Sequence, residues 1–204
     1  RGMVKSVGER LPNCSAAAFA KRCATHVPAV IEPAVSPIVK MIEQLNEQIR
    51  ELDQRIDHLC RYCYGETKWL QTVAGVGPVT ALAYVLTIEE PQRFCKSRQL
   101  GAFLGLTPRR DQSGQINKQL SISKAGNTYL RQLLVNCAHY ILGPFGPDSN
   151  LRRFGLAIAA RGGKNAKKRA AVAVARKLSV LLHRLWLSGE AYQPFYRSQL
   201  RKAA

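Results

Sequence analysis

Apolar residues recur at alternating steps of three and four along the stretch from residue 42 to residue 59. The pattern occupies Ile42, Leu45, Ile49, Leu52, Ile56 and Leu59. Such spacing is typical of the a and d positions of heptad repeats, and it predicts one amphipathic helix with a narrow apolar seam. The seam fits either a coiled coil with another helix or chain, which we favour, or packing against the helix's own domain.

The stretch before this helix is punctuated by proline. Pro12, Pro28, Pro33 and Pro37 all fall within it. Because proline lacks a backbone N–H and its ring clashes with the preceding helical turn, we expect short helices that are broken at these positions. Residues 1–66 are therefore predicted to form a helical and coiled-coil region.

The sequence TVAGVGPVTALAYVL, from residue 72 to residue 86, predicts a tight turn followed by a helix. Gly75 and Gly77 flank Val76, and Pro78 stands where the helix begins, which suits its fixed torsion. This turn resembles the helix-hairpin-helix motif of DNA-binding proteins, in which a phosphate approaches free N–H groups at a helix start. A plain packed pair of helices explains the same residues equally well.

Helical patterns continue toward the C-terminus. We expect Ser97 to cap a short helix that Gly105 ends. NTYLRQLLVNCAHYIL predicts a strong helix, and RGGKNAKKRAAVAVARKLSVLLHRLW predicts a long helix that starts in a Gly-Gly turn. His139 and His183 lie within these apolar helices and are interpreted as core or groove residues. The predicted fold class is therefore mostly α.

A polar segment, RRDQSGQINKQLSISKAGN, separates two of these helices. Its middle, around Ser113 and Gly114, is expected to form a short β-hairpin. The segment gathers small hydroxyls, glycines and cations, which suits either a solvated loop or a place where a serine meets a phosphodiester. The cations considered for phosphate binding are Arg109, Arg110, Lys118 and Lys124.

The charge balance indicates an anionic partner. The 204 residues hold 31 Lys and Arg against 13 Asp and Glu, a formal net charge of +18, which favours nucleic acid. Between Thr107 and Arg184 fifteen residues are basic, and only Asp111 and Asp148 are acidic. A solvated basic face is the alternative, and charge alone would also fit an RNA-binding protein of ribosomal type.

Some of these cations stand near the starts of predicted helices, where the helix dipole disfavours them unless an anion is bound. They are Arg131, Lys164, Lys167, Lys168 and Arg169. We therefore predict that they contact phosphates.

Membrane and disulfide-scaffold classes do not fit the sequence. No apolar run approaches the roughly 18–20 residues that span a bilayer, and the N-terminus has no apolar signal region. The six cysteines lack scaffold spacing, so we interpret them as reduced thiols of a cytoplasmic protein. Cys60 and Cys63 form a CxxC pair without a second pair at zinc-binding spacing, so no metal site is predicted.

Residues 70–190 resemble the C-terminal transposase domain of the insertion-sequence one-ten family, the Piv/MooV group of DEDD-type recombinases. Four blocks carry the resemblance: GVGP, LGAFLGLTP, the SG that follows it, and SKAGNxYLRxLL. The tail RGGKNAKKRAAVAVARKL also looks like a subgroup of that family. The heptad helix is similar to the coiled coil that precedes this domain. The predicted transposase domain covers residues 67–192, followed by a tail over 193–204.

The resemblance implies a function. Family members cut and rejoin DNA with a serine from this domain, and Asp and Glu of an N-terminal RuvC-like domain bind magnesium. A bridge RNA guides at least some members. This chain begins with Arg and shows no carboxylate cluster for two-metal chemistry, so we expect a fragment that lacks the metal domain and is inactive alone. We expect it to bind DNA and a guide RNA, and to form a homo-oligomer through the coiled coil.

Three serines compete as the nucleophile. Ser113 is our first choice, because Gly114 leaves the backbone open to close approach, and in the family the SG serine looks more fixed. Ser123 is second, and it also suits an N-cap or a phosphate ligand; Ser121 is third. Gly75 and Gly77 complete the predicted nucleic-acid contacts. A non-catalytic nucleic-acid-binding module, or a transposon remnant, is the alternative function.

Overall fold

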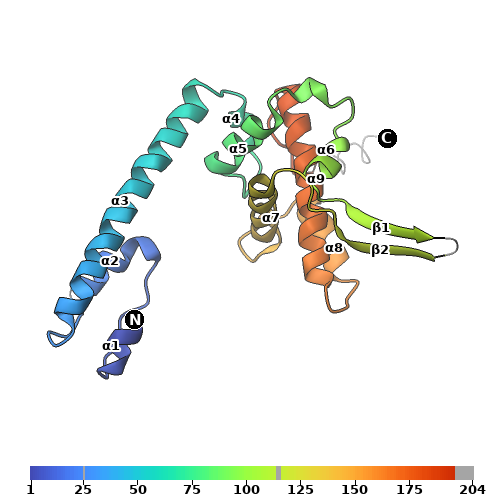
Figure 1. The fold of residues 1–204 in the computed structure, drawn as a ribbon. Coiled ribbons are helices and arrows are strands. Elements are labelled where there is room, and N and C mark those ends of the chain that lie inside the picture. Colours follow the sequence, from blue (N-terminus) through green and yellow to red (C-terminus); the bar gives the residue numbers. More distant parts are fainter. Residues whose placement is uncertain (25, 114–115, 196–204) are drawn as a thin grey trace. The chain divides into compact units, whose positions relative to one another are not determined.

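The structure, a computed structural model, describes residues 1–24, 26–113 and 116–195. Helices dominate this part of the chain, and its strands form a two-stranded antiparallel sheet (Figure 1). The predicted mostly α fold class is thereby confirmed. The chain divides into two compact units, Arg1–Ile56 and Asp57–Ala204. No helix among the described residues has the length and apolar character that crossing a bilayer would require.

The first unit contains α1 (Gly2–Ser6), α2 (Ala16–Ala24) and most of α3 (Glu32–Tyr62). Its buried apolar side chains are few: Val4, Ala20 and Cys23. The side-chain amide of Asn46 on α3 donates a hydrogen bond to the Ala16 carbonyl on α2, with an N–O distance of 3.5 Å. This unit therefore has a small core for its length.

Two of the four N-terminal prolines lie inside α3 and do not end it. Pro33 occupies the first turn, where the missing N–H would have no partner within the helix. Pro37 deprives one preceding carbonyl of its donor, but the helix has 31 residues and its other hydrogen bonds keep it continuous. The prediction that Pro33 and Pro37 break helices is wrong, whereas Pro12 and Pro28 lie outside helices as expected.

The heptad seam lies on α3 and is largely open to solvent. Leu45, Ile49 and Leu52 expose 51%, 55% and 55% of their surface. Packing within the chain does not cover this part of the seam. The coiled-coil interpretation stays a prediction.

The second unit consists mainly of short helices around one long helix. Its helices after α3 are α4 (Thr67–Leu70), α5 (Pro78–Ile88), the 3-10 helix η1 (Pro91–Arg93), α6 (Gln99–Phe103), α7 (Thr128–Leu142), α8 (Asn150–Ala159) and α9 (Ala166–Ser188). α9 packs against α4, α6, α7 and α8, and Val174, Leu178 and Leu182 on it are fully buried. Gly155 on α8 permits the close packing, because a Cβ there would lie 2.5 Å from Val174 Cγ2.

Buried polar groups in this core are paired. The Tyr84 hydroxyl donates to the Ser179 carbonyl at 2.7 Å. His183 Nε2 lies 2.8 Å from the Pro91 carbonyl, and its Nδ1 lies 2.9 Å from Ser97 Oγ. The prediction that Ser97 caps α6 is therefore wrong, because its hydroxyl pairs with His183, and α6 has no side-chain cap. His183 is a core residue as predicted, whereas His139 is exposed on α7.

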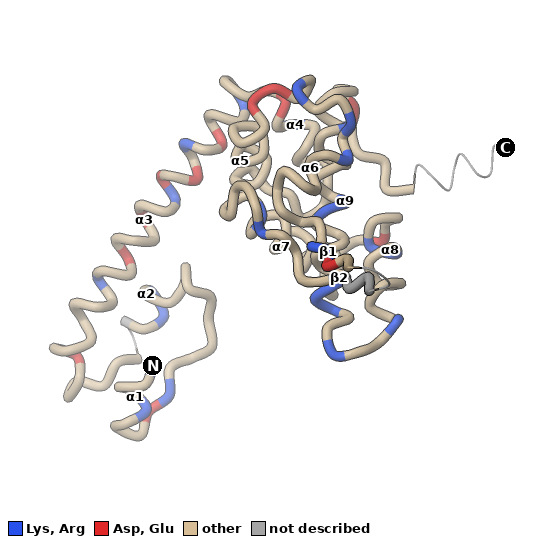
Figure 2. The backbone as a smooth tube through the Cα atoms, turned by 45° about the vertical axis from the view of Figure 1, so that its right-hand side comes forward, with Lys and Arg blue, Asp and Glu red and all other residues tan. Residues whose placement is uncertain are grey.

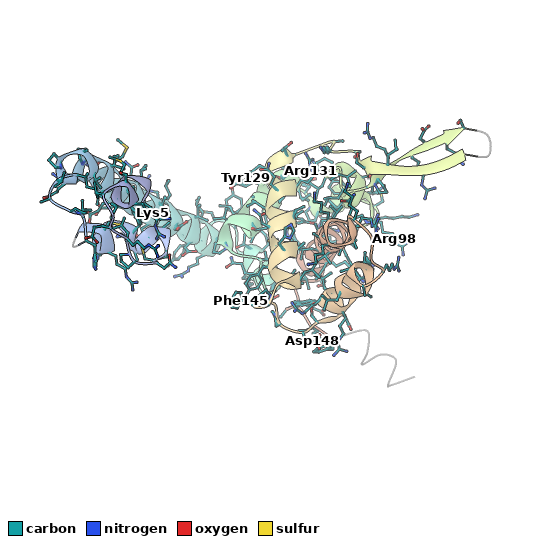
Figure 3. The ribbon with its side chains drawn as sticks, turned by 90° about the horizontal axis from the view of Figure 1, so that it is seen from below. Lys5, Arg98, Tyr129, Arg131, Phe145 and Asp148 are labelled. Carbon is teal, nitrogen blue, oxygen red and sulfur yellow. The ribbon has the colours of Figure 1, made fainter. Side chains whose placement is uncertain are left out.

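The predicted β-hairpin is present and longer than expected. β1 (Pro108–Ser113) pairs antiparallel with β2 (Ile116–Ile122), with Pro108 opposite Ile122 and Ser113 opposite Ile116. The register is irregular between Pro108 and Arg110. Gly114 and Gln115, on which the predicted turn falls, lie outside the described residues. Figure 3 shows the two strands projecting from the helices of the second unit.

Candidate nucleic-acid interface

The hairpin presents polar side chains to solvent on both faces of β1. Arg109, Arg110 and Ser113 are all exposed. The backbone of Lys118 pairs with that of Asp111 across the ladder, but the Lys118 side chain lies outside the described residues. An exposed two-stranded ribbon of this kind has the dimensions to enter the major groove of a duplex.

The base of the hairpin is a close packing of two backbone segments. A Cβ on Gly105 would overlap the backbone of Ala125, and one on Gly126 would overlap the Phe103 carbonyl. Both glycines have positive φ, and so does Lys124, at 58°. The Lys124 N–H donates to the Gly105 carbonyl at 3.1 Å. The LGAFLGLTP and SKAGN blocks therefore need their glycines in order to fit against each other.

Arg131 is a buried residue that stabilises the base of the hairpin through hydrogen bonds. It is only 8% exposed, and its guanidinium donates to the carbonyls of Leu104 (3.1 Å) and Ala125 (2.8 Å) and to the Thr128 hydroxyl (3.0 Å). Figure 3 shows it where the hairpin joins the helices. These oxygens account for a cation near the start of α7 without a phosphate. We therefore leave Arg131 out of the interface.

The three candidate serines lie in different surroundings. Ser113 is exposed at the end of β1, and Ser121 is exposed on β2. Ser123 is half-buried, and its N–H donates to the Thr107 carbonyl at 2.9 Å. Ser123 does not cap α7, because Asn127 does so by accepting from the Leu130 N–H at 2.9 Å. Of the three, Ser113 combines an exposed hydroxyl with exposed arginines on its own strand.

The turn between α8 and α9 carries a second group of exposed cations. Gly162 and Gly163 both have positive φ, so the predicted Gly-Gly turn is present. α9 then begins with no acidic residue in its first turn and no side-chain hydrogen bond from its N-cap residue Asn165. The exposed basic side chains here are Lys164, Lys167, Lys168 and Arg169. Arg169 also donates to the Gly162 carbonyl at 3.1 Å.

This arrangement suits an anion. Backbone N–H groups in the first turn of a helix have no intrahelical acceptor, and the positive end of the dipole adds to the charge of the lysines. A phosphate would relieve the mutual repulsion of these cations and accept from the free N–H groups. Figure 2 shows that Lys and Arg far outnumber Asp and Glu over the second unit.

The predicted turn at Gly75–Gly77 is present, with a positive φ at Gly75 and an extended backbone at Gly77. Gly75 has φ of 88°, Gly77 is the N-cap residue of α5, and Pro78 is its first residue. A Cβ on Gly75 would lie 2.7 Å from Tyr140 Cδ1 on α7, whereas a Cβ on Gly77 would meet nothing within 4 Å. Gly75 is therefore required for packing, and Gly77 is open to a partner. The helix-hairpin-helix interpretation stays a prediction.

Two further arginines hold the second unit together. Arg152 donates to the carbonyls of Ile141 and Gly143 at the end of α7. Arg153 pairs with Asp148, with Nε–Oδ1 of 3.0 Å, and this hydrogen bond lowers the pKa of the Asp148 carboxyl. Asp148 therefore does not neutralise the cations of the hairpin or of the α8–α9 turn.

Sequence reasoning missed a group of cations around a cavity of about 500 Å3 next to α9. They are Arg98, Arg176, Lys177 and Arg184. Three of them lie on one face of α9, and the spacing of residues 176, 177, 180 and 184 is that of a helical stripe. The helical spacing of these cations could have indicated a basic stripe on one face of the helix. From the sequence, these cations were considered only as part of the net charge.

Magnesium, which the resemblance implies for the family, has no site in the described part of the chain. No three His, Cys, Asp or Glu side chains there lie close enough together to hold a metal ion. All six cysteines are free thiols, with Cys60 buried and Cys63 exposed. No step of the proposed chemistry is assigned to a metal held by these residues.

Comparison with known proteins finds a match between this chain and a family of transposases. Residues 67–150 match the family model described as Transposase IS116/IS110/IS902 family. The transposase for insertion sequence element IS1111A of Coxiella burnetii is 37% identical over 125 residues, which are 61% of this chain and 34% of that protein. The transposase for insertion sequence element IS1328 of Yersinia enterocolitica is 38% identical over 69 residues, 34% of this chain and 21% of that protein.

A pilin gene-inverting protein of Moraxella lacunata is also similar, with 32% identity over 110 residues, 53% of this chain and 33% of that protein. The matched part of this chain thus spans about a third or less of the length of each of these relatives. The family-model match covers α4 through the start of α8, and includes the hairpin and its glycine base. The family resemblance named from the sequence is thereby confirmed.

Proposed function

We propose that this chain is the DNA-binding part of a transposase or site-specific recombinase, because residues 67–150 match the model of the IS116/IS110/IS902 transposase family. Relatives described as transposases and as a pilin gene-inverting protein support both branches of this proposal. Inversion and transposition both require a protein that holds DNA strands while phosphodiesters are broken and rejoined. The chain's contribution is to hold the phosphates and to present a serine.

The observation that carries DNA binding is the pair of exposed basic groups in the second unit. One is the hairpin, with Arg109 and Arg110; the other is the α8–α9 turn, with Lys164, Lys167 and Lys168. Apart from Asp148, which pairs with Arg153, only Asp111 is acidic between Thr107 and Arg184. Such a surface attracts a polyanion through the release of condensed counterions.

The chemical role falls to Ser113. Its hydroxyl is exposed at the end of a projecting strand, so it can reach a phosphate that the helical core could not approach. In the proposed step the Ser113 oxygen attacks phosphorus and forms a serine–DNA phosphodiester. The P–O bond to a deoxyribose oxygen breaks, and that oxygen takes up the proton that the serine has lost and leaves as a hydroxyl. Arg109 and Arg110, exposed on the two faces of the same strand, attract the phosphates of the nucleic-acid backbone to the hairpin.

The test of the serine uses a protein that joins this chain to a RuvC-like domain, to which the family resemblance assigns the metal ligands. Ser113→Ala should abolish the covalent protein–DNA adduct and strand exchange while leaving DNA binding nearly unchanged. Ser123→Ala is the matched control and should retain the adduct. Full recombination by Ser113→Ala, or an adduct mapped to Ser123, would contradict the assignment.

The same experiment separates the two functions considered for this chain. If no serine carries an adduct while DNA is still bound, the chain is a nucleic-acid-binding module and the hairpin only clamps phosphates. We propose further that a guide RNA is a second ligand of the basic surface and that the bound protein is associated with the nucleoid. We also propose that a second copy of α3 covers the exposed seam in a homo-oligomer.

A further inference from the structure

The cavity of about 500 Å3 beside α9 lies within the second unit and outside the basic groups assigned to DNA binding. α9 forms one wall, α8 contributes Leu151 and Phe154, and the segment from Tyr192 to Pro194 closes one side. Arg98 and Thr107 line it from the α6 end. Its volume falls within the range of about 300–1,000 Å3 that is usual for small-molecule sites.

The charged part of the cavity lining, which we call the rim, is cationic. Arg98, Arg176, Lys177 and Arg184 line it, and no Asp or Glu does. The three arginines are exposed, and none of them forms a salt bridge within the described part of the chain. Guanidinium groups bind phosphate through paired, charge-assisted hydrogen bonds.

Part of the cavity lining is apolar, and we call this part the floor: Leu151, Phe154, Ala173 and Val180. The Lys177 ammonium lies 3.8 Å from the centroid of the Phe154 ring, so a cation covers one face of that ring. Inorganic phosphate would use the cationic rim and leave this floor exposed to water. A ligand that fits both parts has a phosphate at one end and a flat, largely apolar body at the other.

The walls are fixed by contacts that do not involve the ligand. The Tyr192 N–H donates to Thr72 Oγ1 at 2.9 Å, and the Asn150 N–H donates to the Pro194 carbonyl at 2.9 Å. These two bonds hold the closing segment. The Arg176 stem packs against Gly101, where a Cβ would lie 2.9 Å from Arg176 Cγ. Part of the cost of ordering the site is therefore met before a ligand binds.

We propose that this cavity binds a single nucleotide, with its phosphate on Arg98, Arg176 and Arg184 and its base on the floor formed by Phe154, Ala173 and Val180. The nucleotide comes either from solution, as a nucleoside monophosphate, or from a bound strand, as one unstacked residue. The second source rests on the proposed DNA-binding function, and the first does not.

The first test titrates the full chain by calorimetry with adenosine 5′-monophosphate, adenosine and inorganic phosphate in separate runs. The monophosphate should bind at least about tenfold more tightly than either part, because only it uses the rim and the floor together. Equal affinity for inorganic phosphate would overturn the proposal in favour of a bare anion site. Absence of monophosphate binding would also overturn it, whatever the protein does with DNA.

Variants locate the binding. Arg176→Gln and Arg184→Gln remove rim cations, and Ala173→Leu fills the floor without changing charge. Each should weaken monophosphate binding about tenfold or more. Lys68→Gln, on α4 and outside both the cavity and the basic groups assigned to DNA binding, is the charge-matched control and should bind as wild type does. Circular dichroism confirms folding. Unchanged binding in Ala173→Leu, or an equal loss in Lys68→Gln, would contradict the assignment.

A third experiment identifies the source. A single strand containing 2-aminopurine is bound to the wild type and to Ala173→Leu, and its fluorescence, which rises on unstacking, is recorded. A rise with the wild type alone supports a strand nucleotide in the cavity. Monophosphate binding without a fluorescence rise supports a free nucleotide. Replacing Lys164, Lys167 and Lys168 by Ala should weaken duplex binding and leave monophosphate binding intact, so the two proposals fail separately.

Discussion

α3 and α9 are the two longest helices in the described part of the chain, and each has an apolar stripe with different surroundings. On α9 the stripe faces α4, α6, α7 and α8, and Leu178 and Leu182 are fully buried. On α3 the stripe meets little else of the chain, and Leu45 and Leu52 are more than half exposed. Charged residues of both signs lie along α3 (Figure 2), whereas every charged residue of α9 is basic.

The buried stripe of α9 stabilises the fold of its own unit, whereas the exposed stripe of α3 is available for association with another chain. A helix of 31 residues with an open seam gains little stability from its own chain, because most helical stability in proteins comes from packing of the apolar face. We therefore expect a partner on the α3 seam, whereas the apolar stripe of α9 is already covered by its own unit. The outer stripe of α9 is left free to carry cations, and these make up the rim of the cavity.

The largest effect is expected from charged substitutions in the α3 seam. Leu45→Asp combined with Leu52→Asp should abolish association of the chain, because each unpaired carboxylate buried in a seam costs several kcal/mol. Analytical sedimentation of the wild type and the double variant measures the mass. If both sediment with the same mass, the α3 seam does not mediate association.

Truncating one leucine in each helix compares the apolar stripes of α3 and α9 directly. Leu178→Ala, in the core around α9, should lower the free energy of unfolding by about 2–5 kcal/mol through lost burial and a residual cavity. Leu52→Ala, on the exposed seam, should cost well under about 1 kcal/mol in dilute, monomeric protein. Urea unfolding of both variants gives the values. Equal costs would mean that the α3 stripe is as well covered as that of α9.

Alkaline pH should weaken the second unit through Tyr84. Burial raises the pKa of this phenol well above its usual value, so the folded state keeps the proton after the unfolded state has released it. The stabilising effect is complete below about pH 10 and is lost as pH rises above it. Tyr84→Phe should flatten this decline, although it removes the donor to Ser179 at about 1–3 kcal/mol.

The measurement is the free energy of unfolding of wild type and Tyr84→Phe between pH 8 and pH 11. Burial also raises the pKa of Tyr192 and of the Cys137 thiol, so part of the slope should remain in the variant. Parallel curves for the two proteins would show that the Tyr84 phenol does not contribute to the pH dependence.

Local sequence signals predicted several elements of the second unit. Gly-Gly before a basic helix, Pro78 at a helix start and the apolar period of α7 all act within one or two turns, and each is observed. The hairpin was also predicted around Ser113, although its strands extend further in both directions. Such features depend on backbone torsion and hydrophobic period, which neighbouring residues determine.

Tertiary contacts decided what the sequence could not. From the sequence, Arg131 was predicted to bind phosphate because it is a cation near the start of α7. In the structure its guanidinium donates instead to the carbonyls of Leu104 and Ala125, which precede α7 in the chain and become its neighbours only when the chain folds. Ser97 was predicted to cap α6 because it stands just before that helix. Its actual partner, His183, lies 86 residues further along the chain, so the local sequence does not reveal it. The cavity escaped prediction for the same reason: Arg98 joins the α9 stripe only after α6 packs on α9.

The central claim is that the second unit binds nucleic acid through the hairpin and the α8–α9 turn, and salt dependence tests it most directly. The affinity of the chain for duplex DNA is measured by fluorescence anisotropy over a series of salt concentrations. Log affinity should fall linearly with log salt, by about 0.9 for each phosphate contacted. The variant in which Lys164, Lys167 and Lys168 are replaced by Ala should bind more weakly and with a shallower slope. Binding that stays flat across the salt series, or a triple variant with the slope of the wild type, would contradict the account.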